Sequence, residues 1–293
     1  MRTSKTNRRS SWVLLMVFNL AVLIQLVPAY AGPADDRDPD ELPFELLQGH
    51  LIIVKAFLPG LVRKANLLID TGATATVVSR DVAEQLSMDR ISDGGVGTRA
   101  SAFGAAIKVE RVVLRQLHLG RRVISRPCLA AELPWKEVDI LVGLDILRSA
   151  SLTVDYQKRK VAFGQAFAAG QPVPLEIVQK LIVAPVRLYG LTLRLVVDTG
   201  ALSPVVHEKR VEAWGQQTLG QKRVKLSHGG GTMKARQVTL PDGQIGGLEF
   251  ADIVIHILPG EHSNPSIDGF LGPASLGLET IHLDFERQTL YVE

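Results

Sequence analysis

The sequence has little of what builds cross-linked or metal-centred proteins. Its 293 residues include one cysteine, Cys128, which excludes an intramolecular disulfide framework and a zinc or iron–sulfur site made of several thiolates. The seven histidines form no His-Glu-x-x-His motif or other closely spaced ligand set, so we expect no metal and no cofactor. Helical signal is also scarce, with short candidates at 81–88, 144–150 and 211–216. With 46% hydrophobic and 22% charged residues, the chain is expected to fold around a real core.

The basic charge of the chain is concentrated at its start. A net charge of +3 and a pI of about 9.0 suggest a nucleic-acid or membrane partner. Residues 1–31, however, contain four basic residues, no acid, an apolar stretch from Trp12 to Val27 and a small-x-small end at 29–31. This pattern predicts a signal peptide. Its removal leaves 29 of the 33 basic residues against 30 acidic ones, so we expect no nucleic-acid partner.

The same pattern predicts an exported protein, either periplasmic or secreted. The alternative is a membrane anchor formed by an uncleaved N-terminal segment. A helix needs about 20 apolar residues to span a bilayer, however, and this apolar stretch is shorter. After cleavage we expect no membrane-spanning segment. Residues 32–42 are acidic and contain proline, which predicts a short exposed lead-in.

The rest of the chain repeats itself once. Three blocks recur in one order, so that 67–78, 138–143 and 152–156 match 195–206, 267–272 and 281–285. A period near 128 residues indicates two similar domains rather than a solenoid. We predict an N-terminal lobe at 43–164, a linker at 165–174 and a C-terminal lobe at 175–293.

Within each unit the local pattern predicts β-strands. Short runs of β-branched and aliphatic residues, bounded by turn residues, occur at 51–56, 66–70, 108–114 and 191–197. Their spacing is typical of an all-β barrel or sandwich.

Each copy of the first block places a carboxylate at the end of an apolar strand. Asp70 and Asp198 each stand in an Asp-Thr-Gly-Ala sequence, where the glycine permits a tight turn and lets backbone N–H groups approach the carboxylate. Apolar residues on both sides would return the chain to the core, so the pKa of both carboxyls should be perturbed. Each copy is followed by an apolar-apolar-Gly element at 141–143 or 270–272.

This pattern resembles the retropepsin-like aspartic proteases. The unit length and the alanine after the glycine are similar to those of retropepsins, whereas pepsin-type lobes are longer and usually carry Ser or Thr there. The resemblance covers most of 43–293. It implies a mostly β, bilobed acid-protease barrel fold, in which two retropepsin-like lobes in tandem are related by a pseudo-twofold axis.

The resemblance also implies an aspartic endopeptidase that acts on a polypeptide. Asp70 and Asp198 would be the catalytic pair and would share one proton. The ionised carboxylate would activate a water molecule, and the protonated one would hydrogen-bond the scissile carbonyl. Because one chain supplies both, a monomer would suffice for catalysis.

The neighbours of the two aspartates have implied supporting roles. These active-site supports are Thr71, Gly72, Ala73, Thr199, Gly200 and Ala201. The threonine hydroxyls would bind the opposite lobe, and the glycine N–H groups would face the carboxylates. Because alanine cannot donate the hydroxyl hydrogen bond of pepsins, the pKa of the pair should be raised. We therefore expect activity at mildly acidic to neutral pH.

Two features of the family pattern are less regular here. The first apolar-apolar-Gly element is followed by Asp145, whereas Ala274 stands at the matching place in the second, so the support of the second active loop should differ.

Family members also cover the cleft with a glycine-rich hairpin, or flap. The candidates are Gly94, Gly95 and Gly97 in the first lobe and Gly229, Gly230 and Gly231 in the second, and ordinary loops are an equal alternative.

Other functions fit the residues less well. The His228-Gly-Gly-Gly sequence is similar to the oxyanion-hole motif of esterases, but no G-x-S-x-G motif follows. His118 and His256 are expected to be strand residues rather than the ligands of a metal hydrolase, and Cys128 a core residue. The remaining alternative is a non-catalytic peptide-binding or structural protein with the same bilobed fold.

Overall fold

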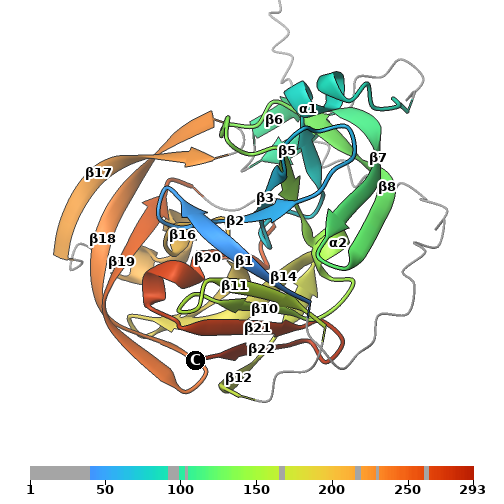
Figure 1. Cartoon of the computed structure of the whole chain (residues 1–293). Helices are drawn as coiled ribbons and strands as arrows, with labels where there is room; N and C mark the ends of the chain where they lie inside the picture. Colours follow the sequence, from blue (N-terminus) through green and yellow to red (C-terminus); the bar gives the residue numbers. More distant parts are fainter. Residues whose placement is uncertain are drawn as a thin grey trace, which may run out of the picture. The chain divides into compact units, whose positions relative to one another are not determined.

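β-Strands make up most of the part of the chain that the structure describes (Figure 1). The structure is a computed structural model, and it describes residues 40–91, 99–102, 105–164, 169–214, 219–228, 231–260 and 264–293. The predicted signal peptide at 1–31 lies outside these residues. The mostly β, bilobed fold expected for two retropepsin-like lobes is confirmed.

In its described part, the first repeat contains β1 to β11 and two short helices. Its elements are β1 (Asp40–Leu47), β2 (Leu51–Ala56), β3 (Ala65–Ile69), β4 (Val77–Ser79), α1 (Arg80–Gln85), β5 (Arg99–Ala102), β6 (Ala105–Lys108), β7 (Glu110–Leu119), β8 (Arg122–Ala131), β9 (Ile140–Val142), α2 (Leu144–Leu147), β10 (Leu152–Asp155) and β11 (Lys160–Phe163).

The second repeat contains β12 to β22 and three 3-10 turns in its described part. Its elements are β12 (Gln171–Pro174), β13 (Glu176–Val178), β14 (Leu181–Leu188), β15 (Leu191–Val197), β16 (Val205–His207), η1 (Glu208–Arg210), η2 (Glu212–Trp214), β17 (Leu219–His228), β18 (Gly231–Ile245), β19 (Leu248–Leu258), β20 (Gly269–Leu271), η3 (Pro273–Leu276), β21 (Thr280–Asp284) and β22 (Thr289–Val292).

The two repeats arrange their strands in the same order. The first runs β2-β3-β9-β4-β8-β7, and the second runs β14-β15-β20-β16-β19-β18. In each, the strand that precedes the Asp-Thr-Gly loop pairs in parallel with the apolar-apolar-Gly strand. Ile69 lies opposite Val142 in the first repeat, and Val197 lies opposite Leu271 in the second. The matched blocks of sequence therefore occupy matched places in the sheets.

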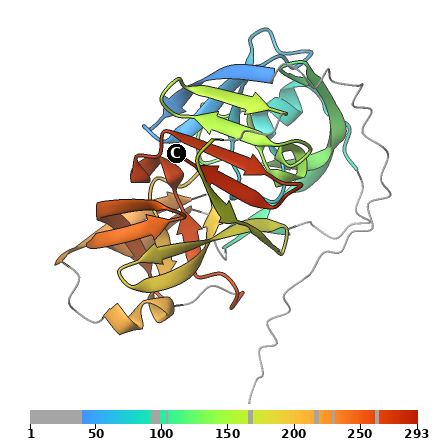
Figure 2. The same cartoon turned by 90° about the horizontal axis from the view of Figure 1, so that it is seen from below.

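A continuous row of strands joins the two repeats. Its order is β12-β22-β21-β10-β11-β1, and β10, β11, β21 and β22 lie side by side in both Figure 1 and Figure 2. β10 and β21, which are equivalent in sequence, pair antiparallel with Thr153 opposite His282. Thr153 Oγ1 and His282 Nδ1 are 2.8 Å apart. Since these two residues also match in sequence, the pseudo-twofold axis passes through this pair.

Two segments that were predicted to be irregular belong to strands. Residues 40–42 of the predicted lead-in open β1, and 171–174 of the predicted linker form β12. β12 contains two prolines, which are tolerated because it is the edge strand of its sheet. Val173, 1% exposed, anchors it in the core. Residues 32–39 and 165–168 lie outside the described part.

The predicted helices are present in shortened form. α1 begins after Ser79, whose Oγ accepts a hydrogen bond from Val82 N at 3.3 Å, as is usual for a helix N-cap. α2 covers the first half of 144–150. Of 211–216, residues 212–214 form the 3-10 turn η2, and 215–216 lie outside the described residues.

The core is shared by both repeats. Ile69 and Val142 of the first repeat and Val197 and Leu271 of the second are fully buried in one hydrophobic cluster. Full burial of such a side chain contributes about 1.5–3 kcal/mol. The strands that lead to the two aspartates are thus held rigidly from both sides.

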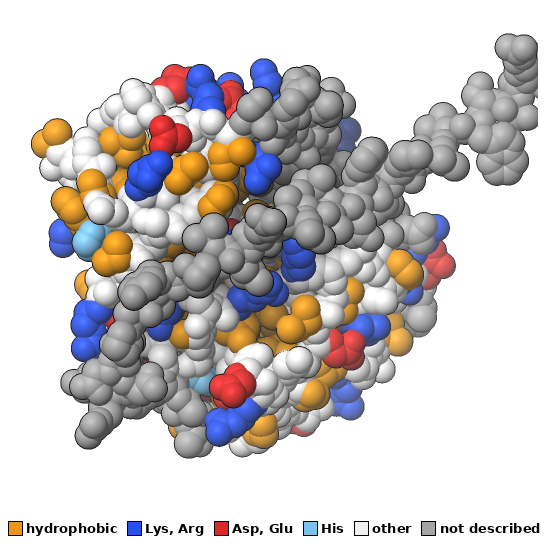
Figure 3. Space-filling view, turned by 90° about the vertical axis from the view of Figure 1, so that its right-hand side faces the viewer, with side chains coloured by type: hydrophobic (Ala, Val, Ile, Leu, Met, Phe, Trp, Pro, Cys, Tyr) orange, Lys and Arg blue, Asp and Glu red, His pale blue; other side chains and the backbone are white. Residues whose placement is uncertain are grey.

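The surface carries charges of both signs. On the face shown in Figure 3, basic and acidic side chains are interspersed with hydrophobic and uncharged ones. Of the helices in the described part, none is long and apolar enough to cross a membrane.

Candidate active site

Asp70 and Asp198 lie at the ends of equivalent strands. Asp70 directly follows β3 and Asp198 directly follows β15. The backbone N–H of Asp70 donates to Val142 O at 3.1 Å, and that of Asp198 donates to Leu271 O at 2.9 Å. Each aspartate is therefore fixed to the neighbouring apolar-apolar-Gly strand of its own repeat. Asp198 is only 5% exposed, whereas Asp70 is half-buried.

The glycines bring the two carboxyl groups together. Gly72 N donates to Asp70 Oδ1 at 2.9 Å, and Gly200 N donates to Asp198 Oδ1 at 2.8 Å. A Cβ atom on Gly72 would lie 2.4 Å from Asp198 Cγ, and one on Gly200 would lie 3.1 Å from Asp70 Cγ. Each glycine therefore serves its own carboxylate and also leaves room for the carboxylate of the other repeat.

The two threonines tie the active loops to each other. Thr71 Oγ1 donates to Val197 O, and Thr199 Oγ1 donates to Ile69 O, both at 2.7 Å. The backbone N–H of each threonine donates to the hydroxyl of the other at 3.1 Å. Both threonines are buried, at 0% and 2% exposure. Four hydrogen bonds thus cross between the repeats directly beneath the carboxylates.

The surroundings of the two carboxyls favour sharing a proton. Burial raises the pKa of Asp70 to about 6, although backbone N–H groups and a hydrogen bond with Asp198 oppose the rise. Burial and the nearby charge of Asp70 raise the pKa of Asp198 well above its usual value. Because the pKa of both carboxyls is raised and the two groups interact, they titrate as a pair that can hold one proton between them.

The alanines continue each loop with backbone contacts alone. Ala73 N donates to Asp70 O at 3.4 Å, and Ala201 N donates to Asp198 O at 3.2 Å. Ala73 O in turn accepts from Leu144 N at 2.8 Å. Neither methyl side chain can donate a hydrogen bond to a carboxylate.

The first active loop is supported by a charged side chain behind it. Asp145 Oδ1 accepts from Thr76 Oγ1 at 2.7 Å, and Thr76 Oγ1 accepts from Gly143 N at 3.2 Å. Arg126 Nη2 lies 3.5 Å from Asp145 Oδ2. Since Thr76 follows the Asp-Thr-Gly loop and Asp145 lies in α2, these bonds join the loop to the helix behind it.

The second active loop has a different support. Where the first repeat has Asp145 the second has Ala274, and instead Ser203 Oγ lies 2.6 Å from His256 Nδ1. His256 N also donates to Pro204 O at 2.9 Å. Burial lowers the pKa of His256, so the ring is neutral at neutral pH. Sequence reasoning missed this role, although the loss of the acid at 274 indicated that another polar group was needed.

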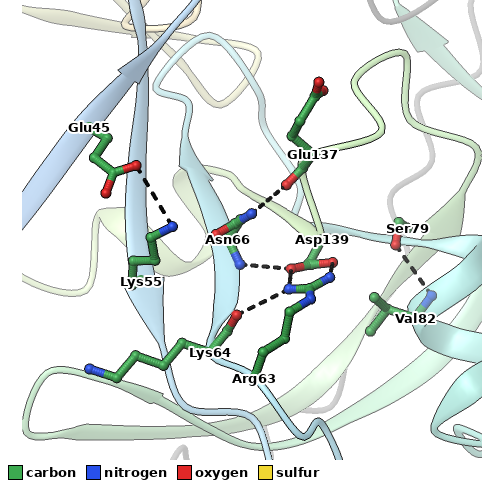
Figure 4. Close-up of polar contacts among 9 residues, drawn as sticks. All are labelled: Glu45, Lys55, Arg63, Lys64, Asn66, Ser79, Val82, Glu137 and Asp139. Carbon is green, nitrogen blue, oxygen red and sulfur yellow. Dashed lines mark hydrogen bonds and ion pairs between the residues drawn. The ribbon is translucent and has the colours of Figure 1, made fainter.

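An aspartate also holds the backbone of the strand that leads to each active loop. Asp139, which is 3% exposed, receives two bonds from the Arg63 guanidinium, at 2.5 and 2.8 Å, and one from Asn66 N at 2.7 Å (Figure 4). In the second repeat, Asp268 Oδ2 accepts from Arg194 N at 2.8 Å. The sequence repeat contained both acids, but it did not reveal this positioning role.

The flap candidates fall mostly outside the described residues. This applies to Gly94, Gly95, Gly97, Gly229 and Gly230. Gly231 is the first residue of β18 and pairs with His228, the last residue of β17. In the first repeat the hairpin at the corresponding place is formed by β5 and β6. The identity of the flap stays a prediction.

The other chemistry-bearing residues do not form a second centre in the described part. Burial raises the pKa of Cys128 to about 12, so its thiol stays protonated and unreactive. Among the described side chains, no three His, Cys, Asp or Glu residues are grouped as a metal site.

Each repeat matches a model of a protein family. Residues 62–149 match the family described as gag-polyprotein putative aspartyl protease, and 184–273 match the family described as aspartyl protease. Each match includes one of the two Asp-Thr-Gly loops and its apolar-apolar-Gly strand. The two families describe the same kind of protease, so the internal repeat is recognised on both sides independently.

Curated relatives resemble part of the chain. DNA damage-inducible protein 1 of Phaeosphaeria nodorum is 30% identical over 124 residues, which is 42% of this chain and 27% of that protein. The protein of the same name from Neurospora crassa is 34% identical over 95 residues, 32% of this chain and 21% of that protein. UBA domain-containing protein Mud1 of Schizosaccharomyces pombe is 29% identical over 110 residues, 38% of this chain and 32% of that protein. The chain thus matches less than a third of the length of these relatives.

The prediction of export to the periplasm or the medium is wrong by this comparison. The relatives are described by a response to DNA damage, which takes place inside the cell, or by a UBA domain, and none is described as exported. The alternative of an N-terminal membrane anchor has no support in these descriptions either. A basic segment followed by a short apolar stretch was therefore insufficient evidence for the destination of the protein.

Proposed function

The chain belongs to the retropepsin-like family of aspartic proteases, and from this premise we propose that it is an endopeptidase that hydrolyses peptide bonds with Asp70 and Asp198. The observation that carries the proposal is the approach of the two carboxyls across the two repeats. A Cβ atom on Gly72 would lie 2.4 Å from Asp198 Cγ, so the glycine of one loop is needed for the carboxylate of the other.

The proposed reaction uses one carboxyl as base and the other as acid. Asp70, the more exposed of the two carboxyls, is proposed as the base and takes a proton from a water molecule as the water oxygen attacks the peptide carbonyl carbon. Asp198, whose pKa is raised by burial and by the nearby charge of Asp70, is proposed as the acid that hydrogen-bonds the carbonyl oxygen and stabilises the charge that develops there. The tetrahedral intermediate collapses when the C–N bond breaks and the leaving nitrogen receives a proton from the pair. No covalent acyl-enzyme forms. Such general acid–base assistance is worth roughly 10²–10⁴-fold.

Rigid positioning supplies a further part of the proposed rate enhancement. The hydrogen bonds between Thr71 and Thr199 prevent the two loops from moving apart. The buried strands before them restrict rotation of the aspartate backbone. A pair of groups held in reacting geometry in this way avoids the entropic cost of bringing them together during the reaction.

The proposal is tested by peptide hydrolysis with conservative variants of each aspartate. Purified wild-type chain is incubated with a mixed peptide library, and products are identified by mass spectrometry. Asp70→Asn and Asp198→Asn should each reduce cleavage by about 10²–10⁴-fold, because each removes one proton-transfer group. Asp242→Asn, an exposed aspartate in β18, is the matched control and should cleave like wild type.

Two results would contradict the proposal. Equal cleavage by wild type and both active-site variants would mean that the observed activity comes from another site or from a contaminant. Folded wild-type chain that binds peptides but cleaves none of them would favour the alternative of a non-catalytic peptide-binding protein.

A further inference from the structure

The hairpin of β17 and β18 carries positive charge on one side. In the register of these strands, Arg223 lies opposite Arg236 and Lys225 lies opposite Lys234. Residues opposite each other on antiparallel strands share a face, as do residues two apart along a strand. The four side chains therefore lie on one face of the hairpin, which we call the cationic face. Arg223, Lys225 and Lys234 are exposed, and Arg236 is half-buried.

The opposite face of the hairpin is held by the core. Val224 lies opposite Ala235, and Leu226 lies opposite Met233. All four pack in the hydrophobic cluster that includes Phe270 of β20. This contact fixes which side of the hairpin faces inward, so the cationic face is directed away from the core of the second repeat.

Three of the four cations have no acidic partner among the described residues. Arg236 pairs with Glu208 at 2.8 Å, whereas no ion pair involves Arg223, Lys225 or Lys234 in that part of the chain. Like charges directly opposite each other destabilise a strand pair. The β5–β6 hairpin of the first repeat has one pair of cations on opposite strands, whereas the β17–β18 hairpin has two. The fold therefore does not require two such pairs.

The strand that carries Arg223 and Lys225 also has a free edge. β17 is the last strand of its sheet, so along its outer side the described residues provide no partner strand. An extended peptide placed there would direct every second side chain to the cationic face, with those side chains about 6.8 Å apart. Arg223 and Lys225, which are two residues apart on β17, repeat with the same spacing.

We propose that the cationic face binds an extended acidic segment of a polypeptide, laid along β17 with carboxylates at alternate positions. Charge complementarity selects acidic over neutral sequences, and the spacing of the strand selects alternate over adjacent carboxylates. That the segment belongs to a substrate rests on the proposed protease function, whereas the binding itself does not.

The test is fluorescence anisotropy with labelled peptides and the full chain carrying Asp70→Asn, which prevents cleavage during the measurement. The probes are an alternating Glu-Thr peptide, its Gln-Thr counterpart, and a peptide of equal composition with glutamates in adjacent pairs. The alternating acidic peptide should bind most tightly. Arg223→Gln, Lys225→Gln and Lys234→Gln should each weaken its binding about two- to fivefold, and the triple variant should weaken it at least about tenfold.

Lys222→Gln is the matched control. Lys222 is exposed on the same strand and has the same charge, but it belongs to the other face of the hairpin. Its loss should change the affinity less than twofold, roughly the smallest effect expected of an exposed charge. Equal weakening by Lys222→Gln and Lys225→Gln, or unchanged binding by the triple variant, would overturn the proposal. Equal affinity for the alternating and paired peptides would overturn the strand-like geometry.

The outcomes separate this inference from the proposed function. Tight binding of the acidic peptide by a chain that cleaves nothing would contradict the protease function and leave the cationic face intact. Cleavage of peptides with no preference for acidic segments, together with absent binding, would retain the protease and remove the binding surface.

Discussion

Asp70 and Asp198 occupy equivalent positions in the two repeats and yet differ in their surroundings. Asp198 is almost completely buried, whereas Asp70 retains more contact with solvent. Burial raises the pKa of both, and the charge of Asp70 raises the pKa of Asp198 further. The sequence predicts a perturbed pair but not this difference in burial, because burial depends on small differences in packing between two similar loops.

The first residue-scale prediction concerns the pH dependence of hydrolysis. Activity requires one ionised and one protonated carboxyl, so kcat/KM should rise with pH as the pair loses its first proton, near the value of about 6 given by Asp70, and fall again at higher pH as the pair loses its second proton. Initial rates measured across the pH range with one peptide provide the profile. A maximum below about pH 3 would contradict the assignment, because both carboxyls would then be protonated.

The raised pKa of Asp198 should also make the stability of the chain depend on pH. A carboxyl whose pKa is raised by folding binds more protons in the folded state, so its contribution to the free energy of unfolding falls as pH rises from about 4 through the folded-state value. Asp198→Asn removes this effect. The variant should be more stable than wild type at pH 7.5, and the difference should shrink at pH 4. Urea denaturation of wild type and variant at pH 7.5 and at pH 4 measures this difference in the free energy of unfolding. Lower stability of the variant at pH 7.5 would contradict the raised pKa.

The threonine hydroxyls between the two loops should contribute to the stability of the chain. Thr199→Val deletes the hydroxyl that donates to Ile69 O and accepts from Thr71 N, so two buried polar groups lose their partner. Each such loss costs about 1–3 kcal/mol. Thr199→Ser keeps the hydroxyl and should retain most of the stability. A Val variant as stable as the Ser variant in urea denaturation would show that these bonds do not hold the repeats together.

At the scale of elements, the two active loops have the same shape but different supports. The first rests on Asp145 of α2, and the second on the contact between Ser203 and His256 of β19. Deleting the Asp145 side chain by Asp145→Ala should cost about 1–3 kcal/mol, because the buried Thr76 hydroxyl loses its acceptor. Asp89→Ala, which breaks an exposed ion pair with Arg115, should cost less than about 1 kcal/mol. Equal losses in thermal unfolding would contradict a special role for Asp145.

The elements that the sequence predicted are those with a local signal. The apolar runs at 66–70 and 191–197 correspond to β3 and β15 because the last three residues of each strand are buried on both faces, which requires continuous hydrophobic residues there. β12 was missed because its prolines and its one buried valine give no period. The supports Asp139 and His256 were missed because their partners lie 53 or more residues away in the sequence.

At the scale of the whole described molecule, the two repeats are joined by a sheet and a core. The row of strands from β12 to β1 includes three from each repeat, and Thr153 and His282 meet at its centre. The sequence predicted two similar lobes around one site, since the repeat is explicit. It did not predict this sheet, because pairing between distant strands leaves no trace in local periodicity.

We infer that one chain forms the site from both of its repeats. It is tested by measuring peptide hydrolysis for wild type and for an equimolar mixture of Asp70→Asn and Asp198→Asn chains. If each chain builds its own site, every site in the mixture lacks one carboxyl, so wild type should cleave the peptide at a rate proportional to its concentration and the mixture should cleave no faster than either variant alone. Recovery of activity on mixing would contradict the account, because it would require Asp70 of one chain to act with Asp198 of another.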